Sequence, residues 1–229
     1  MIKRATICGL LLLSPLAGAQ TSLVDRRASD FESKGVGLTE TLLEFSDREH
    51  VPMAIEYVDR GSMERPVEVH LRDKDIRQSI DSILRNGNGY RWNLRNGLVE
   101  VTNTHASKRL ERLLDVDIPD FQIAGGENAL VASTMLWWDL QRRIDQKIPG
   151  FGGDIAGRSS TVMPTKLRNR TVRQILSYII RNSRADGWIV AGPPECLGFT
   201  PYCGLWYIVE PEPFDASYEI VLKKVRENL

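Results

Sequence analysis

An internal repeat constrains the fold of this chain more than any other feature of its sequence. Residues 71–86 align without a gap with residues 167–182, and seven of the 16 positions are identical. The matches include charged as well as apolar positions, such as Arg77 with Arg173 and Ile83 with Ile179. Agreement at both kinds of position is typical of a duplicated structural unit, so the same unit is expected to be built twice.

Each copy has the pattern of a strand followed by a helix. In the first copy, apolar residues at 67, 69 and 71 alternate with polar ones, which is the period of a half-buried strand. Asp73 and Asn169 are suitable N-cap residues ahead of apolar positions that share one helical face. These apolar positions are Ile76, Ile80, Ile83 and Leu84 in the first copy, and Val172, Leu176, Ile179 and Ile180 in the second.

The polar positions of these helices are expected to form a solvated face. They are Arg77, Gln78 and Arg85 in the first copy, and Arg173, Gln174 and Arg181 in the second. The alternative is that the repeated arginines form a shared partner-binding face.

A hairpin is predicted after each helix. In the first copy, segments 90–94 and 98–102 flank Arg95-Asn96-Gly97, and Asn-Gly supplies the positive φ angles of a tight turn. In the second copy, segments 187–191 and 205–210 flank a longer loop at 192–204. Upstream, the first copy is expected to contain a strand from Phe31, a helix through 38–45 and a strand at 53–58. The second is expected to contain a strand at 118–123 and a helix through Leu136, Leu140 and Ile144.

This order predicts an α+β fold of two tandem small βαβ-βαββ modules. Ile118-Pro119-Asp120-Phe121-Gln122-Ile123 resembles the opening strand of the secretin and TonB short N-terminal domain family. Residues 67–84, with 90–101, resemble the closing half of that domain, and the resemblance covers residues 31–103 and 118–211. The family has no catalytic residues to transfer, and we expect no pore or barrel to be attached to the two copies. The resemblance therefore implies a periplasmic docking module.

The first nineteen residues have the three parts of a secretory signal. Lys3 and Arg4 precede an apolar run at residues 5–13, and small residues at 17–19 give a cleavage site before Gln20. That run is about half of the roughly 20 residues that a membrane-spanning helix needs. We expect a signal peptide at 1–19, the first repeat at 20–103, a linker at 104–117, the second repeat at 118–211 and a tail at 212–229.

The charge balance and the cysteines fit a periplasmic or secreted protein. Removal of Lys3 and Arg4 leaves 28 basic against 30 acidic side chains, so the mature chain carries a net charge of −2. This balance argues against a nucleic-acid binder and against a polybasic membrane-surface protein. No later apolar run is long enough to span a bilayer. Cys196 and Cys203 are expected to form a disulfide, because an exported chain meets an oxidising compartment.

The sequence has no recognisable motif of an enzyme or of a metal site. It lacks Gly-x-Ser-x-Gly and a phosphate-binding Gly-x-x-x-x-Gly-Lys motif, and its three histidines are not spaced as ligands. We expect no catalytic residue, no metal and no cofactor.

Three aromatic residues are the candidate partner-binding residues: Trp138, Phe199 and Tyr202. Trp137 is expected in the core, and Trp138 is expected at the edge of the same helical face. The alternative for Trp138 is a place between the two repeats, packed against both. Phe199 and Tyr202 lie within the loop closed by the cysteines, either as a recognition tip or as a satellite cluster.

These features favour an exported, non-enzymatic module that docks a protein of the envelope or of the secretion machinery. Strand addition at an exposed sheet edge is one expected mode of docking. The alternative is a carbohydrate-directed protein, either a cell-wall glycan binder or a weak glycan hydrolase. A third interpretation is a structural protein whose copies stack on one another. The sequence does not fix the oligomeric state.

Overall fold

The computed structural model describes residues 22–58, 60–87, 89–105, 114–143, 161–183, 187–191 and 207–209. Within these ranges the chain is a mixture of helices and small sheets, so the predicted α+β class is confirmed. The predicted signal peptide at 1–19 and tail at 212–229 lie outside the described residues, and so do Cys196, Cys203, Phe199 and Tyr202. No helix in the described ranges is long and apolar enough to cross a membrane.

The described elements of the first repeat follow the predicted order, with two short helices in addition, whereas the second repeat, in the part that the structure describes, has a single strand between its two helices where the predicted module has two. After a short 3-10 helix, η1 (Leu23–Asp25), the first repeat contains β1 (Phe31–Gly37), α1 (Leu38–Glu49), β2 (Met53–Val58), α2 (Arg60–Glu64), β3 (Pro66–Leu71), α3 (Ile76–Leu84), β4 (Tyr90–Arg95) and β5 (Leu98–Asn103). The second contains β6 (Asp117–Ile123), α5 (Ala129–Arg143), β7 (Thr165–Thr171), α6 (Val172–Arg181), β8 (Gly187–Ala191) and β9 (Tyr207–Val209).

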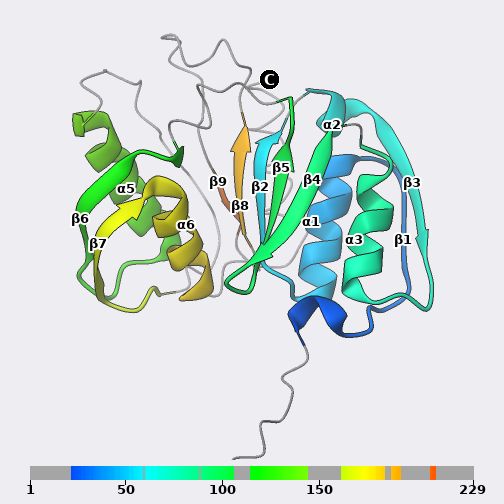
Figure 1. The fold of residues 1–229 in the computed structure, drawn as a ribbon, viewed down its shortest axis with the longest axis horizontal. Coiled ribbons are helices and arrows are strands. Elements are labelled where there is room, and N and C mark those ends of the chain that lie inside the picture. Colours follow the sequence, from blue (N-terminus) through cyan, green and yellow to red (C-terminus); the bar gives the residue numbers. More distant parts are fainter. Residues whose placement is uncertain are drawn as a thin grey trace, which may run out of the picture.

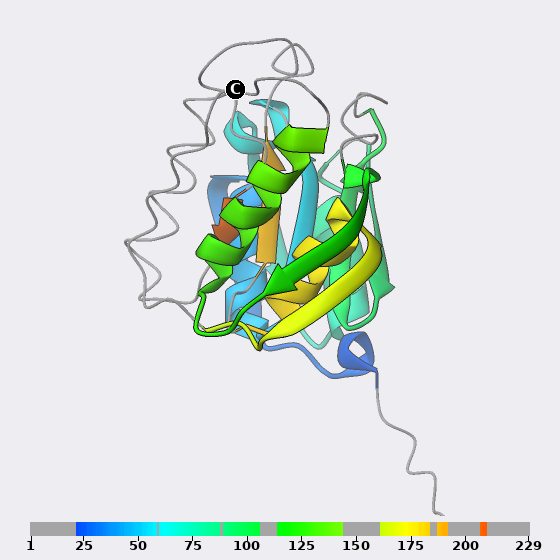
Figure 2. The same cartoon turned by 90° about the vertical axis from the view of Figure 1, so that its left-hand side faces the viewer.

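The two repeats share one central sheet. Its strand order is β4-β5-β2-β8-β9, and β2 pairs in parallel with β5 on one side and with β8 of the second repeat on the other. Figure 1 shows α1 and α3 on one face of this sheet and α5 and α6 on the opposite face. The two-stranded sheets β1–β3 and β6–β7 lie on the outer sides of the helices, and Figure 2 shows β7 in front of α6 and β6 beside α5.

The outer sheets of the two repeats have the same register. Phe31 of β1 lies opposite Leu71 of β3, and Phe121 of β6 lies opposite Leu167 of β7. The backbone N–H of Ile76 donates to the carbonyl of Arg26, and that of Val172 donates to the carbonyl of Val116. The first residues of α3 and α6 are therefore held by equivalent backbone hydrogen bonds in the two repeats.

The helices α3 and α6 begin with the same device. Asp75 and Thr171 accept a hydrogen bond from the backbone N–H of Gln78 and Gln174, whose side chains bond back to the cap residue. This reciprocal pair is a capping box.

The N-caps predicted at Asp73 and Asn169 are therefore wrong by two residues. Asp73 and Asn169 instead adopt φ angles of 53° and 49°, a left-handed conformation that Asp and Asn tolerate better than most residues. They turn the chain from the strand toward the helix, and the next Asp or Thr caps it.

The first hairpin turns on two residues rather than the predicted three. Arg95 pairs with Leu98, and the turn consists of Asn96 and Gly97 with φ angles of 54° and 77°. Positive φ at both positions is the signature of the turn type that matches strand twist. In the second repeat, β8 pairs antiparallel with β9, as predicted, and the loop at 192–204 lies outside the described residues.

Alternation along the shared strands divides the apolar residues into two cores. Met53 and Ile55 of β2, with Val99 and Val101 of β5, face the first repeat. Ala54 and Leu98 face the other way and pack with the helices of the second repeat. The next residues in that alternation are Glu56 and Glu100, which are both buried. A face that joins two repeats therefore carries two carboxylates.

Candidate functional site

The junction between the repeats contains an ion cluster. Glu56 on β2 and Glu100 on β5 lie on the sheet face toward α6, because the side chains of a strand alternate between its two faces. Burying a carboxylate is costly unless it is paired, so both groups need cationic partners. Arg173 and Arg95 supply them.

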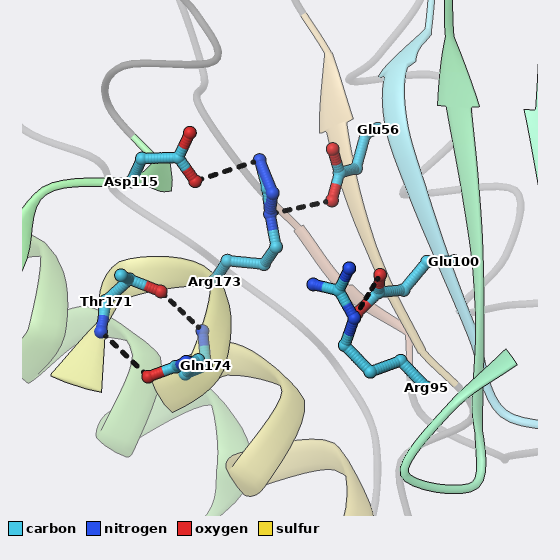
Figure 3. Close-up of polar contacts among 7 residues, drawn as sticks. All are labelled: Glu56, Arg95, Glu100, Asp115, Thr171, Arg173 and Gln174. Carbon is cyan, nitrogen blue, oxygen red and sulfur yellow. Dashed lines mark hydrogen bonds and ion pairs between the residues drawn. The ribbon is translucent and has the colours of Figure 1, made fainter. Parts of the chain in front are cut away.

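Arg173 reaches from the first turn of α6 to two carboxylates. Its Nε lies 3.2 Å from Oε1 of Glu56, and its terminal nitrogen lies 3.4 Å from Oδ1 of Asp115. Figure 3 shows the guanidinium between Glu56 on one side and Asp115 on the other. The side chain of Arg173 is only 15% exposed, so the prediction of a solvated face is wrong for this residue. In the shared sheet, Glu56 on strand β2 of the first repeat lies against Arg173 of the second repeat. The equivalent residue of the first repeat, Arg77, is half exposed.

The corresponding ion pair in the first repeat lies at the surface. Arg77 is the counterpart of Arg173, and its terminal nitrogen lies 3.1 Å from Oδ1 of Asp25. Both of these side chains are about half exposed. Arg77 also lies over the ring of Trp92, 5.7 Å from its centroid. The two repeats thus hold the same Arg–Asp pair, but only the second adds a buried glutamate from its neighbour.

Burial raises the pKa of Glu56 to about 7, and this effect exceeds the lowering of that pKa by Arg173. The nearby carboxylates of Glu100 and Asp115 raise the pKa of Glu56 further, and Arg95 lowers it. Glu56 therefore titrates near neutral pH, whereas a carboxyl in water is ionised there.

A cleft of about 460 Å³ lies beside this cluster. It is bounded by the Arg95–Asn96 end of the β4–β5 hairpin on one side and by β7 and α6 on the other. Its lining contains four arginines and one carboxylate: Arg95, Arg170, Arg173, Arg181 and Glu100. The Nε of Arg95 lies 3.6 Å from Glu100, so that carboxylate is already neutralised, and the cleft as a whole is basic.

Trp138 is an exposed residue on α5, whereas Trp137 lies in the second core. Trp137 is 2% exposed, which confirms its predicted place, and Trp138 is 58% exposed. The alternative of Trp138 packed between the repeats is therefore wrong. Val131 is also exposed, and seven residues of helix bring it to the same face as Trp138. The structure does not place Trp138 beside the arginine cleft, whose lining residues come from other elements.

The described residues contain no group of three or more His, Cys, Asp or Glu side chains that could hold a metal ion. No protein-family model, no curated protein and no solved structure matches this chain. The function is therefore interpreted from the geometry of the junction and of the exposed surface.

Sequence reasoning missed Glu56, Glu100 and the cleft. A signal was present, since Glu56 follows Met53-Ala54-Ile55 and Glu100 lies between Val99 and Val101. A charge within such a strand indicates either a solvated face or a buried ion pair. The shared sheet decides between them, and its pairing of β2 with β8 leaves no trace in local periodicity.

Proposed function

We propose that the chain is an exported, non-enzymatic protein-binding module that docks a partner of the cell envelope or of the secretion machinery. The observation that carries the proposal is Trp138, a large aromatic side chain of α5 that is 58% exposed and shares a helical face with the exposed Val131. Exposed tryptophans are frequent anchors of protein interfaces, because a rigid apolar ring gains much from burial.

The order of elements supports the same proposal. The first repeat runs strand, helix, strand, strand, helix and hairpin, with the short α2 inserted, and this is the order that the resemblance to secretin and TonB short N-terminal domains implies. The signal-like N-terminus supports export to the compartment where such modules dock.

A sheet edge offers a second mode of docking. β4 is an outer strand of the five-stranded sheet, and among the described strands it pairs only with β5. Its other edge presents backbone groups to which an extended segment of a partner can pair.

A capture experiment from envelope extract tests the proposal. The wild-type chain is expected to retain a specific protein, and Trp138→Ala is expected to lose it. Lys34→Ala is a control, because Lys34 is an exposed residue of β1, and Figure 1 shows β1 and α5 at opposite ends of the molecule. Loss of capture with both variants, or with neither, contradicts a docking role for Trp138.

A glycan-binding assay decides between this proposal and a carbohydrate-directed function. Binding to purified cell-wall glycan that disappears in Trp138→Ala would favour the carbohydrate alternative, because aromatic rings also stack on sugars. No glycan binding, together with a captured protein, supports the docking module.

A further inference from the structure

The geometry points to a binding site for an acidic peptide segment in the arginine cleft between the repeats. The cleft combines the end of the β4–β5 hairpin from the first repeat with β7 and α6 from the second. Its ligand therefore touches both repeats at once. Because that ligand is a peptide, the site depends on the proposed protein-binding function and specifies the chemistry of the partner.

The arginines of the cleft differ in how many of their N–H donors already have a partner. Arg173 is held by Glu56 and Asp115, and Arg95 by Glu100. Arg181 donates to the backbone carbonyls of Ser177 and Asn96, which uses only part of its five N–H donors.

Arg170 is the least engaged of the four. Its side chain is exposed, and the structure gives it no ion pair within the described part of the chain. Arg170 and Arg181 thus have N–H donors available to bind a carboxylate of the ligand. A guanidinium binds a carboxylate through two parallel hydrogen bonds.

The first repeat shows that this basic surface is not a requirement of the fold. At the position that matches Ser177, the first repeat has Asp81, which accepts a hydrogen bond from the indole of Trp92. The second repeat replaces that carboxylate with a serine, and Ser177 is 9% exposed. Among the described residues its buried Oγ has no hydrogen-bond partner. The replacement removes a negative charge from the cleft and leaves a polar group in its lining.

The spread of the charges favours an extended ligand over a small anion. The two available arginines lie at opposite ends of α6: Arg170 lies two residues before its first residue and Arg181 is its last, and the 10 residues of the helix span about 15 Å at a rise of about 1.5 Å per residue. A single phosphate or carboxylate cannot reach both ends of such a row.

A peptide strand can reach both ends. It places alternate side chains on one face about 6.6 Å apart, so three alternating acidic residues span roughly 13 Å. The partly buried Leu167 and Tyr178 in the lining offer apolar contact to the residues between them.

Fluorescence anisotropy on the full chain tests the site. The probe is a labelled peptide with three glutamates at alternating positions, and its control carries glutamine in their place. The glutamate peptide is expected to bind and the glutamine peptide is not. Arg170→Ala and Arg181→Ala are each expected to weaken binding about tenfold or more, since each removes a charged hydrogen-bond donor.

Arg85→Ala is the matched control. Arg85 holds the position of Arg181 in the first repeat, is exposed, and does not line the cleft. Its substitution changes the net charge equally and is expected to leave the affinity within about twofold, because a distant exposed charge is screened. Equal losses with Arg85→Ala and Arg181→Ala would mean that the peptide senses only overall charge, and this would overturn the site.

Competition with small anions separates an extended site from a phosphate site. Inorganic phosphate and citrate are expected to displace the labelled peptide only at concentrations far above that of the unlabelled peptide. Displacement by phosphate at the same concentration overturns the peptide assignment, and so does a glutamate peptide that fails to bind. If that peptide fails while envelope capture still depends on Trp138, the cleft site is wrong and the docking function stands.

Discussion

The Nε of Arg173 lies 3.2 Å from Oε1 of Glu56, and this ion pair joins α6 of the second repeat to β2 of the first. Both side chains are largely buried, in contrast to the equivalent pair of Arg77 and Asp25 in the first repeat. The exposed Arg77–Asp25 pair therefore serves as a control for measuring what the buried Arg173–Glu56 pair contributes to stability.

At pH 8, where Glu56 is mostly ionised in the wild type, Arg173→Ala is expected to lower the free energy of unfolding by up to about 3 kcal/mol, because it leaves Glu56 buried without its main cationic partner. Arg77→Ala is expected to cost about 1 kcal/mol or less, because its partner remains in water and only an exposed pair is lost. Urea unfolding of both variants measures the difference. Similar losses in the two would contradict a buried junction.

Glu56→Gln is expected to flatten part of the pH dependence of stability. The pKa of Glu56 rises from 4.5 in the unfolded chain to about 7 in the folded one, so the folded state binds more protons between these values. The contribution of Glu56 to the free energy of unfolding is therefore complete below about pH 4.5 and is lost as the pH rises through 7. The whole contribution is at most about 3 kcal/mol.

Thermal unfolding of the wild type and of Glu56→Gln at pH 5 and pH 8 checks the sign. The melting temperature of the wild type should fall more between the two pH values than that of the variant. Parallel pH profiles for the two proteins would mean that Glu56 does not titrate in this range.

Loss of either capping box should destabilise the fold by about 1 kcal/mol, because an N-terminal N–H of the helix loses its acceptor. The substitutions are Asp75→Ala for α3 and Thr171→Ala for α6. Asp75→Asn and Thr171→Ser keep a capping oxygen and should stay within a few tenths of a kcal/mol of the wild type in urea unfolding. Caps at Asp73 and Asn169 would instead leave both alanine variants as stable as their controls.

The adjacent tryptophans of α5 should respond in opposite ways. Trp137→Ala is expected to lower the free energy of unfolding by about 3–5 kcal/mol, because it empties a large part of the second core. Trp138→Ala is expected to change it by less than about 0.5 kcal/mol, as for an ordinary surface substitution. Chemical denaturation measures both, and a large loss for Trp138→Ala would show that this ring is part of the core.

Local patterns in the sequence were enough to predict most elements, because each is set by residues close together in the chain. The alternation before Leu71 and the apolar face from Ile76 to Leu84 appear in the structure as predicted, and the first hairpin turns at Asn96-Gly97, within the predicted turn and one residue shorter than it. The offset between the copies correctly paired α3 with α6, since the capping boxes and strand registers match.

The junction could not be predicted in the same way. Arg77 and Arg173 occupy equivalent positions in equivalent helices, so no local rule distinguishes them. Only the parallel pairing of β2 with β8 buries one and leaves the other at the surface. Such long-range pairing depends on how two whole units fit together, and this also determines where Glu56, Glu100 and the cleft lie.

Backbone NOE contacts between β2 and β8 in solution test the shared sheet most directly. The account predicts contacts in parallel register between Met53 and Gly187, Ala54 and Trp188, and Ile55 and Ile189. Strong contacts from β8 to another strand in place of β2 would separate the two repeats. Arg173 would then lose its buried partner, and the cleft would lose one of its walls.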